Sequence, residues 1–348
     1  MNNSQRPPVR RQPPKRTSQR QPQRRQQGGG YTSNFTIISL IIIAILVFIN
    51  VRIFSGIITD NPDVVTLAVR QENHEEAERA QKIKHDLKTN FTQITVSGDD
   101  VKCGNLILVN NDNAYSFDAV PKAVTKETLV SFSGRQSSSY TVSYPARETL
   151  TPTAMESFNA LADAFRDEKG HEDLFILDSF RSYEDQERVY ETKGAEIATI
   201  PGYSEHHTGL AFDLELYIGG KTQDFDGTGD YSWVSQNCHK YGYILRYPAD
   251  KTEITEISYE PWHFRYVGKE HAYYMMANNL CLEEYIHILS KYTADGNRLI
   301  FETDDGEKYM IYSQSVSGSS ASVYVPKNLP YTLSGDNNGH IIVSCKVA

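Results

Sequence analysis

The alternation of apolar and polar residues in the middle of the chain predicts a helix followed by a strand. Over residues 152–169, apolar side chains recur at the spacing of one helix face. Pro152 suits the first turn of such a helix, and Gly170 follows its end. The apolar run Leu174–Leu177 then predicts a buried strand that leads into residues 178–181. We expect the helix to pack on the sheet that contains this strand.

Two further segments alternate with the period of two that is typical of strands. From Leu210 to Tyr217, every second residue is leucine or phenylalanine. Asp213 lies between two of them and therefore points away from the leucine face. From Trp262 to Val267, aromatic side chains alternate with the remaining ones. His263 is therefore able to face a different surface from its aromatic neighbours.

Local signals predict further elements. Ser182 and Asp185 resemble a capping box that opens a helix. Helical segments are expected from about Tyr231 to Tyr241 and from Lys269 to about Ser290, and the apolar run Leu106–Val109 predicts a buried strand. After residue 290 the pattern changes to short β-like runs, some of them separated by turn signals.

These elements predict the fold class and the domain organisation. A chain of 348 residues exceeds the usual size of one domain, so accessory segments beside one catalytic domain are expected. We predict an α+β domain over residues 105–290, in which helices flank a small antiparallel sheet. A small β-rich region over residues 291–348 follows it.

A long apolar stretch near the N-terminus predicts a transmembrane helix. Residues 35–51 are almost entirely apolar, and the apolar character resumes after Arg52. About 20 such residues span a bilayer as a helix, and this segment lacks the polar face of a buried core helix. We therefore expect a signal anchor over residues 35–58. A cleaved signal peptide is the main alternative, but the long leader and the lack of a small-x-small cleavage site disfavour it.

The distribution of charge sets the expected topology. Of the 35 Lys and Arg residues, nine lie within residues 1–52, which contain no Asp or Glu, so the rest of the chain has 26 basic and 44 acidic residues. Basic residues beside a membrane span stay in the cytoplasm. Residues 1–34, rich in Pro, Gln and Arg, are thus expected to be a disordered cytoplasmic tail, residues 59–104 a stalk or linker, and the catalytic domain extracellular. The acidic bulk argues against nucleic acid as a partner.

The cysteine content leaves the disulfide pattern open. The chain has four cysteines, which allow three full pairings, and an oxidising compartment would permit them. Their wide spacing provides no CxxC zinc knuckle, so structural or free thiols are the simpler interpretation. The residues are Cys103, Cys238, Cys281 and Cys345.

Two short segments contain the residue types that bind catalytic zinc. Residues 202–215 read GYSEHHTGLAFDLE, and residues 260–268 read EPWHFRYVG. Catalytic zinc takes imidazole and carboxylate ligands and keeps a fourth position for water. A single histidine in either segment would usually be structural. The combination of a loop histidine, a strand aspartate seven residues later and a separate Glu-x-x-His favours a metal site.

The motif SxHxxGxAxD over residues 204–213, together with EPWH over residues 260–263, resembles the VanY-like family of D-alanyl-D-alanine carboxypeptidases. The resemblance covers about residues 105–285 and includes SFRS at residues 179–182 and YGYILRYP at residues 241–248. The N-terminal segments and the C-terminal β-rich region lie outside it. The resemblance is carried by several motifs at matching spacing and is therefore specific.

The resemblance implies the roles of five residues. His206, Asp213 and His263 match the zinc ligands, which places the zinc site on the sheet. Glu260 matches the base that deprotonates the metal-bound water, and Arg181 matches the residue that stabilises the developing oxyanion. This division of roles is physically reasonable, because zinc and a guanidinium both stabilise negative charge while a carboxylate transfers the proton.

Three further polar residues lie beside the matched ones. Ser204 and Gln186 match positions that bind substrate, although either is also able to brace the loop or helix that carries it. His207 is adjacent to His206 and competes with it for the role of ligand. The spacing to Gly209 and Asp213 favours His206.

The resemblance implies a zinc-dependent enzyme that removes terminal D-alanine from peptidoglycan stem peptides outside the membrane. An L,D-carboxypeptidase acting on tetrapeptide stems is an alternative within the same family. A non-catalytic cell-wall-binding protein is an alternative from a different class, and the presence of all five matched residues argues against it. The sequence leaves the oligomeric state and protein partners open.

Overall fold

The computed structural model describes residues 62–194 and 198–347, and within the first helix it describes side chains from residue 75 onward. The chain divides into two compact units, residues 1–75 and 76–348, and the description below concerns the second. The expected tail and membrane segment, residues 1–58, lie outside the described residues. Among the helices that the structure does describe, none is long and apolar enough to cross a membrane.

The segment expected to be a stalk contains a helix and a strand. Helix α2 spans Pro62–Asn90 and includes the charge-dense stretch of the sequence. Strand β1, Phe91–Ser97, follows directly and pairs antiparallel with β12, Ser320–Pro326. The 3-10 helix η1, Asp100–Lys102, comes next. Residues 91–102 therefore belong to the folded unit and are not part of a linker.

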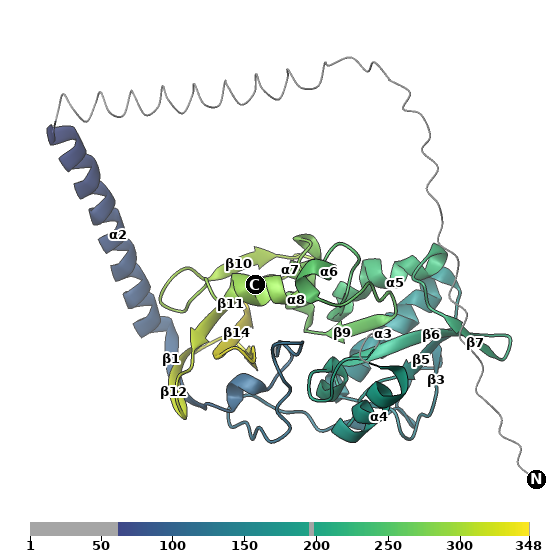
Figure 1. Ribbon diagram of the computed structural model, residues 1–348. Helices are drawn as coiled ribbons and strands as arrows, with labels where there is room; N and C mark the ends of the chain where they lie inside the picture. Colours follow the sequence, from purple (N-terminus) through teal and green to yellow (C-terminus); the bar gives the residue numbers. More distant parts are fainter. Residues whose placement is uncertain (1–61, 195–197, 348) are drawn as a thin grey trace, which may run out of the picture. The chain divides into compact units, whose positions relative to one another are not determined.

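A central sheet organises the middle of the chain (Figure 1). Its strands lie in the order β3, β5, β6, β9 and β8, and β7 pairs with the end of β6. Their bounds are β3 Tyr140–Val142, β5 Leu174–Asp178, β6 Ala211–Ile218, β7 Lys221–Asp224, β8 Tyr243–Leu245 and β9 His263–Tyr266. All pairs are antiparallel except β3 with β5, which are parallel. The fold is thus mixed α/β, and the strands expected at residues 174–177, 210–217 and 262–267 are confirmed.

Helix α3, Pro152–Lys169, packs on this sheet as the apolar spacing predicts. Thr151 caps its first turn, and Gly170 ends it in a left-handed conformation with φ of +74°. The fully buried ring of Phe158 lies 4.5 Å from the ring of Phe212 and 4.8 Å from that of Tyr140, measured between centroids. These aromatic contacts join the helix to the strands and form the centre of the core.

Two of the predicted helices differ from expectation. The helix expected at residues 231–241 consists of the α-helix α5, Ser232–Asn237, flanked by the 3-10 helices η3, Gly229–Tyr231, and η4, Cys238–Tyr241. The helix expected from residue 269 to 290 is two helices, α7 and α8, with bounds Lys269–Ala277 and Leu282–Leu289. The break lies at Asn279, which has φ of +50°. The N–H groups of Asn279 and Leu280 donate to the carbonyls of Met276 and Met275, the pattern of a Schellman motif, which terminates α7.

The remaining short elements connect these parts. Helix α4, Tyr183–Lys193, begins with the predicted capping box between Ser182 and Asp185. Helix α6, Thr252–Thr255, lies between β8 and β9. Strands β2, Val130–Ser131, and β4, Thr149–Leu150, form a separate pair.

The apolar run Leu106–Val109 is buried but is not a strand, so that prediction is wrong. Its backbone groups bind mainly side chains in place of a neighbouring strand, although the Leu108 N–H donates to the Asp336 carbonyl at 3.2 Å. The Leu106 N–H donates to Ser334 Oγ at 2.9 Å, and the Arg265 guanidinium donates to the carbonyls of Asn105 and Ile107 at 3.0 and 2.9 Å. An apolar run shows that a segment is buried but does not show where its backbone hydrogen bonds go.

The β-like runs after residue 290 form strands, as expected. Three of them and a strand that the pattern did not predict, Tyr331–Gly335, make an antiparallel sheet in the order β10, β11, β14, β13. Their bounds are β10 Leu299–Glu302, β11 Lys308–Ser315, β13 Tyr331–Gly335 and β14 His340–Lys346. Ile311 and Ile342 of this sheet share a buried cluster with Ile286 of α8 and Ile244 of β8. The C-terminal region therefore shares a hydrophobic core with the central part.

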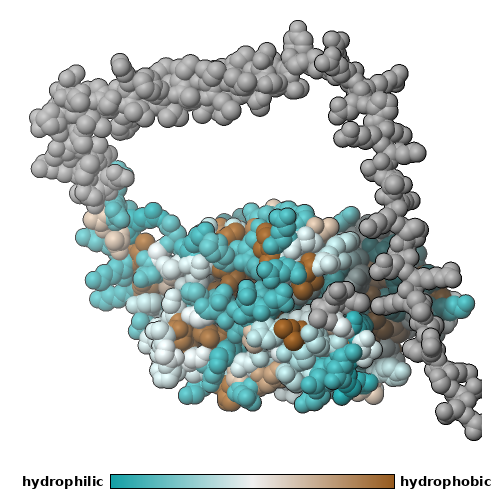
Figure 2. All heavy atoms as spheres, viewed as in Figure 1, coloured by the Kyte–Doolittle hydropathy of each residue, from teal (hydrophilic) through white to brown (hydrophobic). Residues whose placement is uncertain are grey.

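The four cysteines all lie in the described part of the chain, where they are buried and free. They form no disulfide with one another, and burial raises the pKa of each thiol. The face of the folded unit seen in Figure 2 is largely hydrophilic, with hydrophobic residues confined to small separate patches. Apolar side chains thus gather mainly in the interior.

We expect Phe158→Ala to lower the free energy of unfolding by about 3–5 kcal/mol, because it removes a fully buried ring and leaves a cavity between helix and sheet. Urea denaturation followed by circular dichroism measures this change. Val120→Ala, at a side chain that is 71% exposed, is the control and should change stability by less than about 0.5 kcal/mol. Equal stability of the Phe158 variant and the wild type would contradict the assignment of Phe158 to the core.

Candidate metal centre

The pairing of two strands brings Asp213 and His263 together. Asp213 on β6 is directly opposite His263 on β9 in the antiparallel register. Side chains opposite each other in such a pair project on the same side of the sheet. His263 Nδ1 accordingly lies 2.9 Å from Asp213 Oδ1. Two of the three residues with metal-ligand chemistry are therefore placed by strand register alone.

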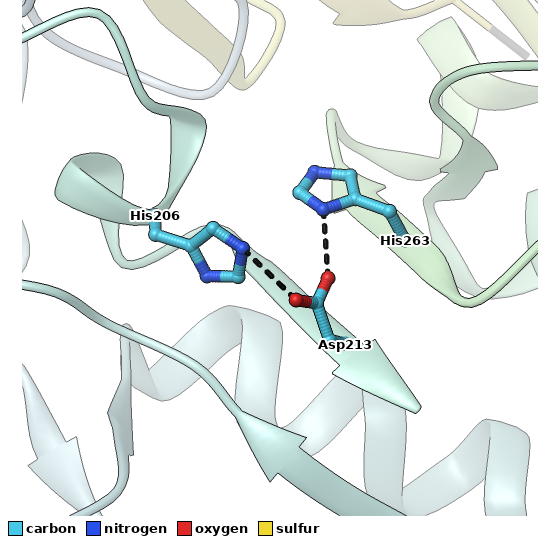
Figure 3. A group of neighbouring side chains, drawn as sticks. All are labelled: His206, Asp213 and His263. Carbon is cyan, nitrogen blue, oxygen red and sulfur yellow. Dashed lines mark hydrogen bonds and ion pairs between the residues drawn. The ribbon is translucent and has the colours of Figure 1, made fainter. Parts of the chain in front are cut away.

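The third residue, His206, is placed by a short turn before β6. It lies in the 3-10 helix η2, Glu205–Thr208, which Ser204 caps through the backbone N–H of His206. Gly209 ends this helix with φ of +68°, a conformation that favours glycine, and the chain then enters β6. His206 Nε2 lies 3.5 Å from Asp213 Oδ2. Figure 3 shows both imidazoles directed at the Asp213 carboxylate.

In each imidazole, the ring nitrogen that points away from Asp213 lies beside a hydrogen-bond acceptor of its own. His206 Nδ1 lies 2.5 Å from the carbonyl oxygen of Ser179, and a carbonyl accepts only, so Nδ1 carries the hydrogen. His263 Nε2 lies 3.4 Å from Glu205 Oε2, also an acceptor. With a metal bound, these contacts would leave His206 Nε2 and His263 Nδ1 as the nitrogens with lone pairs, and both face Asp213. Metal-binding histidines are oriented in this way.

The set of His206, Asp213 and His263 fits a catalytic metal ion. One donor atom from each residue lies within 4.8 Å of the others. Two imidazoles and a carboxylate are among the three-residue sets that catalytic zinc takes, with a fourth position for water. Both histidines are buried, which excludes competing solvent from most of the site. These three residues are therefore able to hold a divalent metal, and Figure 3 shows their arrangement.

His207, the other candidate at this position, faces away from the metal ligands. Its Nδ1 donates to the Arg181 carbonyl at 2.8 Å, and its Nε2 accepts from the Gly202 N–H at 3.0 Å. Both ring nitrogens are thus used by the backbone, and burial lowers the pKa of the ring. The geometry favours His206 over His207 as a ligand, in agreement with the spacing argument.

The charges of the ligands depend on one another. Burial opposes ionisation of Asp213, but the imidazoles of His206 and His263 outweigh it and hold the pKa of Asp213 well below its usual value. Burial likewise disfavours a charged His263, yet its hydrogen bonds to Asp213 and Glu205 raise its pKa to about 9 in the absence of a metal. Asp213 is therefore an anion at neutral pH, as a metal ligand must be.

Glu260 lies beside the ligands because of a turn. The His263 N–H donates to the Glu260 carbonyl at 3.2 Å, and Pro261 occupies the second position of this turn, where its fixed φ is favourable. Glu260 Oε2 is 4.0 Å from His263 Nδ1. Burial raises the pKa of Glu260, although the nearby His263 opposes the shift. A carboxylate with a raised pKa beside a metal site is suited to proton transfer.

Arg181 reaches the site from the loop after β5. Its Nε donates to Asp178 Oδ2 at 2.8 Å and its Nη2 donates to Asp213 Oδ2 at 3.3 Å. Its Nη1 donates to Gln186 Oε1 at 3.0 Å. These contacts use one N–H on each nitrogen, which leaves further guanidinium donors for another ligand. The side chain is held rigidly and is only 11% exposed.

The two residues matched to substrate binding have different surroundings. The buried Gln186 accepts from Arg181 with its amide oxygen and donates from Nε2 to the Thr199 carbonyl at 2.7 Å. These are the contacts of a bracing residue. Ser204 lines the cavity at the ligands, and its hydroxyl also caps η2. A role of either side chain in binding substrate stays a prediction.

A small cavity joins these groups. It has a volume of about 120 Å³ and is lined by the three ligands together with Glu260, Arg181 and Ser204, among others. A neighbouring cavity of about 630 Å³ shares Arg181 with it and is lined by Arg147 and Arg188. The ligand set, a carboxylate and a guanidinium thus line one small cavity beside a larger one.

The sequence analysis missed a group of buried charges behind His263. Glu205 lies between the guanidinium groups of Arg246 and Arg265, and all three side chains are fully buried. The sequence feature that could have predicted this group is the position of Arg246 and Arg265 within apolar segments. A charged residue at such a position is almost never fully buried unless it is paired, so an internal counter-charge was to be expected.

Comparisons with known proteins agree with this site. A family model described as VanY, D-alanyl-D-alanine carboxypeptidase, matches residues 147–269. A D-alanyl-D-alanine carboxypeptidase of Enterococcus faecium is 34% identical over 260 residues, which are 73% of this chain and 79% of that protein. VanXYC of Enterococcus gallinarum, a bifunctional D-Ala-D-Ala dipeptidase and D-Ala-D-Ala carboxypeptidase, is 37% identical over 157 residues, covering 41% of this chain and 80% of that protein.

The fold is also similar to a solved structure. The crystal structure of the vancomycin resistance D,D-dipeptidase VanXYg, in complex with a D-Ala-D-Ala phosphinate analogue, is 28% identical to this chain with a TM-score of 0.64. The match covers 74% of this chain and 99% of that one. The extent of these matches confirms the resemblance inferred from the motifs. The chain belongs to the VanY family of D-alanyl-D-alanine carboxypeptidases.

Proposed function

We propose that this protein is a zinc carboxypeptidase that removes the terminal D-alanine of peptidoglycan stem peptides. The observation that carries the proposal is one cavity lined by His206, Asp213 and His263 together with Glu260 and Arg181. The names of the relatives support the substrate class, since they include D-alanyl-D-alanine carboxypeptidases and a dipeptidase with a D-Ala-D-Ala analogue bound.

The residues of the cavity divide the chemistry of amide hydrolysis among them. Zinc held by the three ligands would polarise the scissile carbonyl and lower the pKa of the attacking water to about 7. Glu260 would accept the proton of that water and deliver it to the leaving amine. The remaining N–H donors of Arg181 would stabilise the negative charge that develops on the carbonyl oxygen.

The larger neighbouring cavity supports a peptide substrate. It adjoins the ligand cavity at Arg181 and is lined by side chains of both charges, the basic Arg147, Arg188 and Lys193 and the acidic Glu148, Asp178 and Asp185. The stem peptide would extend from the metal site into this space with its terminal residue beside Arg181. A carboxypeptidase needs two such spaces, a small one for the terminal residue that it releases and an open one for the rest of the substrate peptide.

The two alternative functions differ from the proposed one in which stem peptides the protein would cleave. An L,D-carboxypeptidase would release D-alanine from tetrapeptide stems and leave pentapeptide stems intact. A non-catalytic wall-binding protein would release D-alanine from neither. Liquid chromatography of both peptides after incubation with the purified chain distinguishes the three possibilities, and the proposal requires cleavage of the pentapeptide.

We also propose that residues 35–58 anchor the chain in the cell membrane with residues 1–34 in the cytoplasm. The support is the basic leader before an apolar segment of membrane-spanning length. The catalytic domain would then lie outside the cell beside its peptidoglycan substrate.

The first prediction concerns the metal. His206→Ala should lose most of its bound zinc, because it removes one of three protein ligands, whereas His207→Ala should retain about one zinc per chain. Mass spectrometry of the metal content of the purified chain tests this. Retention of zinc by the His206 variant and its loss from the His207 variant would reverse the assignment.

The second prediction concerns Glu260. Glu260→Gln should keep its zinc yet release D-alanine about 10²- to 10⁴-fold more slowly, because the amide cannot take up the proton. The exposed Glu253→Gln on α6 is the matched control and should be as active as the wild type. Near-normal turnover by a zinc-loaded Glu260→Gln chain would exclude Glu260 as the base.

The third prediction concerns topology. A protease added to intact cells from which the wall has been removed should digest a tag at the C-terminus. A cytoplasmic marker protein should stay intact in the same cells. Protection of the tag together with the marker would rule out an extracellular catalytic domain.

A further inference from the structure

A cluster of four charged side chains, three of them fully buried, lies behind the metal ligands. Arg246 Nε and Arg265 Nη1 both donate to Glu205 Oε1, each at 2.7 Å. On its other side, Arg246 forms two bonds with the carboxylate of Glu283 on α8, at 2.9 and 2.6 Å. Arg265 continues to the carbonyls of Asn105 and Ile107. The cluster thus connects η2, β9, α8 and the segment at residues 105–107.

The two oxygens of Glu205 have different partners. Both arginines bind Oε1, while Oε2 lies 3.4 Å from His263 Nε2. The arginines therefore fix the carboxylate from one side and leave its second oxygen directed at the far nitrogen of a metal ligand. Since the carboxylate has no exposed surface, water does not compete for that contact.

Stability alone is a poor explanation for this arrangement. Removing charged groups from water is costly, and apolar side chains of similar size often stabilise a core as well or better. A carboxylate behind a ligating histidine has a more specific effect, because it fixes the tautomer and the ring orientation of the imidazole. In this site it would keep the hydrogen on Nε2 and the lone pair on Nδ1, which faces Asp213.

We propose that Glu205 is a positioning residue that orients His263 to bind the metal through Nδ1, with Arg246 and Arg265 holding the carboxylate in place. The inference rests on the proposed metal site and adds to it a residue that has no place in the ligand set. Glu283 shares Arg246 with Glu205, but its carboxylate binds Arg246 and Asn110 and, within the described residues, makes no hydrogen bond to His263. It therefore provides a matched control within the same cluster.

The test compares Glu205→Gln with Glu283→Gln in the full chain. With its amide oxygen on the arginines, the new glutamine side chain would present an N–H to His263 Nε2, so the imidazole would have to move its hydrogen to Nδ1, the nitrogen that binds the metal. Competition with a chelator should show zinc affinity about 10- to 100-fold weaker in Glu205→Gln and unchanged in Glu283→Gln. The absorption spectrum of the cobalt-substituted chain should change only in Glu205→Gln.

A second variant covers the case in which Glu205→Gln does not fold. Glu205→Asp keeps the negative charge between the arginines but is shorter, so it should still fold and yet bind zinc more weakly than the wild type. Thermal unfolding followed by circular dichroism confirms that each variant is folded. Wild-type zinc affinity in the folded Glu205 variants would overturn the proposal, and so would an equal loss of affinity in Glu283→Gln.

His206→Ala separates failure of this proposal from failure of the proposed metal site. If His206→Ala loses zinc while both Glu205 variants bind it as the wild type does, the metal site stands and the positioning role is wrong. If His206→Ala also binds zinc like the wild type, the metal is held elsewhere. In that case the proposed site and the role of Glu205 fall together.

Discussion

The register between β6 and β9 is the constraint on which the site depends. It sets Asp213 opposite His263, and the chain direction then fixes the positions of η2 before β6 and of the Glu260 turn before β9. Because side chains alternate between the two faces of a sheet, a slip of one residue would turn one of the two ligands to the opposite face. The apolar core beneath the sheet, centred on Phe158 and Phe212, prevents such a slip, since it would bring polar residues into contact with the aromatic rings.

The site also depends on the arrangement of charges around the ligands. Arg181 stands between Asp178 and Asp213 on one side, and Glu205 stands between two arginines on the other. Each of these charges is thus paired, which avoids the large penalty of an isolated buried charge. The pairing also restrains the side chains, because a guanidinium that binds several fixed acceptors has few orientations left. A rigid set of donors is what metal binding and oxyanion stabilisation require.

The sequence predicted those features that depend on local signals. The first turn of α3 at Pro152, the capping box at Ser182 and the alternation around Asp213 all depend on residues close together in the chain, and each is found as expected. Features that depend on distant partners were missed. The break at Asn279 needs a backbone conformation that asparagine only sometimes adopts, and the run at residues 106–109 is covered by side chains from β9 and β13. Glu205 lies within the motif at residues 204–213, but its pairing could not be predicted because its partners, Arg246 and Arg265, lie 41 and 60 residues further along the chain.

The pairing of β1 with β12 has a consequence for how the chain folds as it is made. Strand β1 leaves the ribosome early, but its partner begins at Ser320, which follows Ser97 by 223 residues. Contacts this distant in sequence form late, because closing the intervening loop costs chain entropy. The central sheet and its helices are complete before β12 is synthesised, so they have time to assemble first. Throughout that time β1 lacks the strand with which it pairs, and this pairing forms only after β12 has been made.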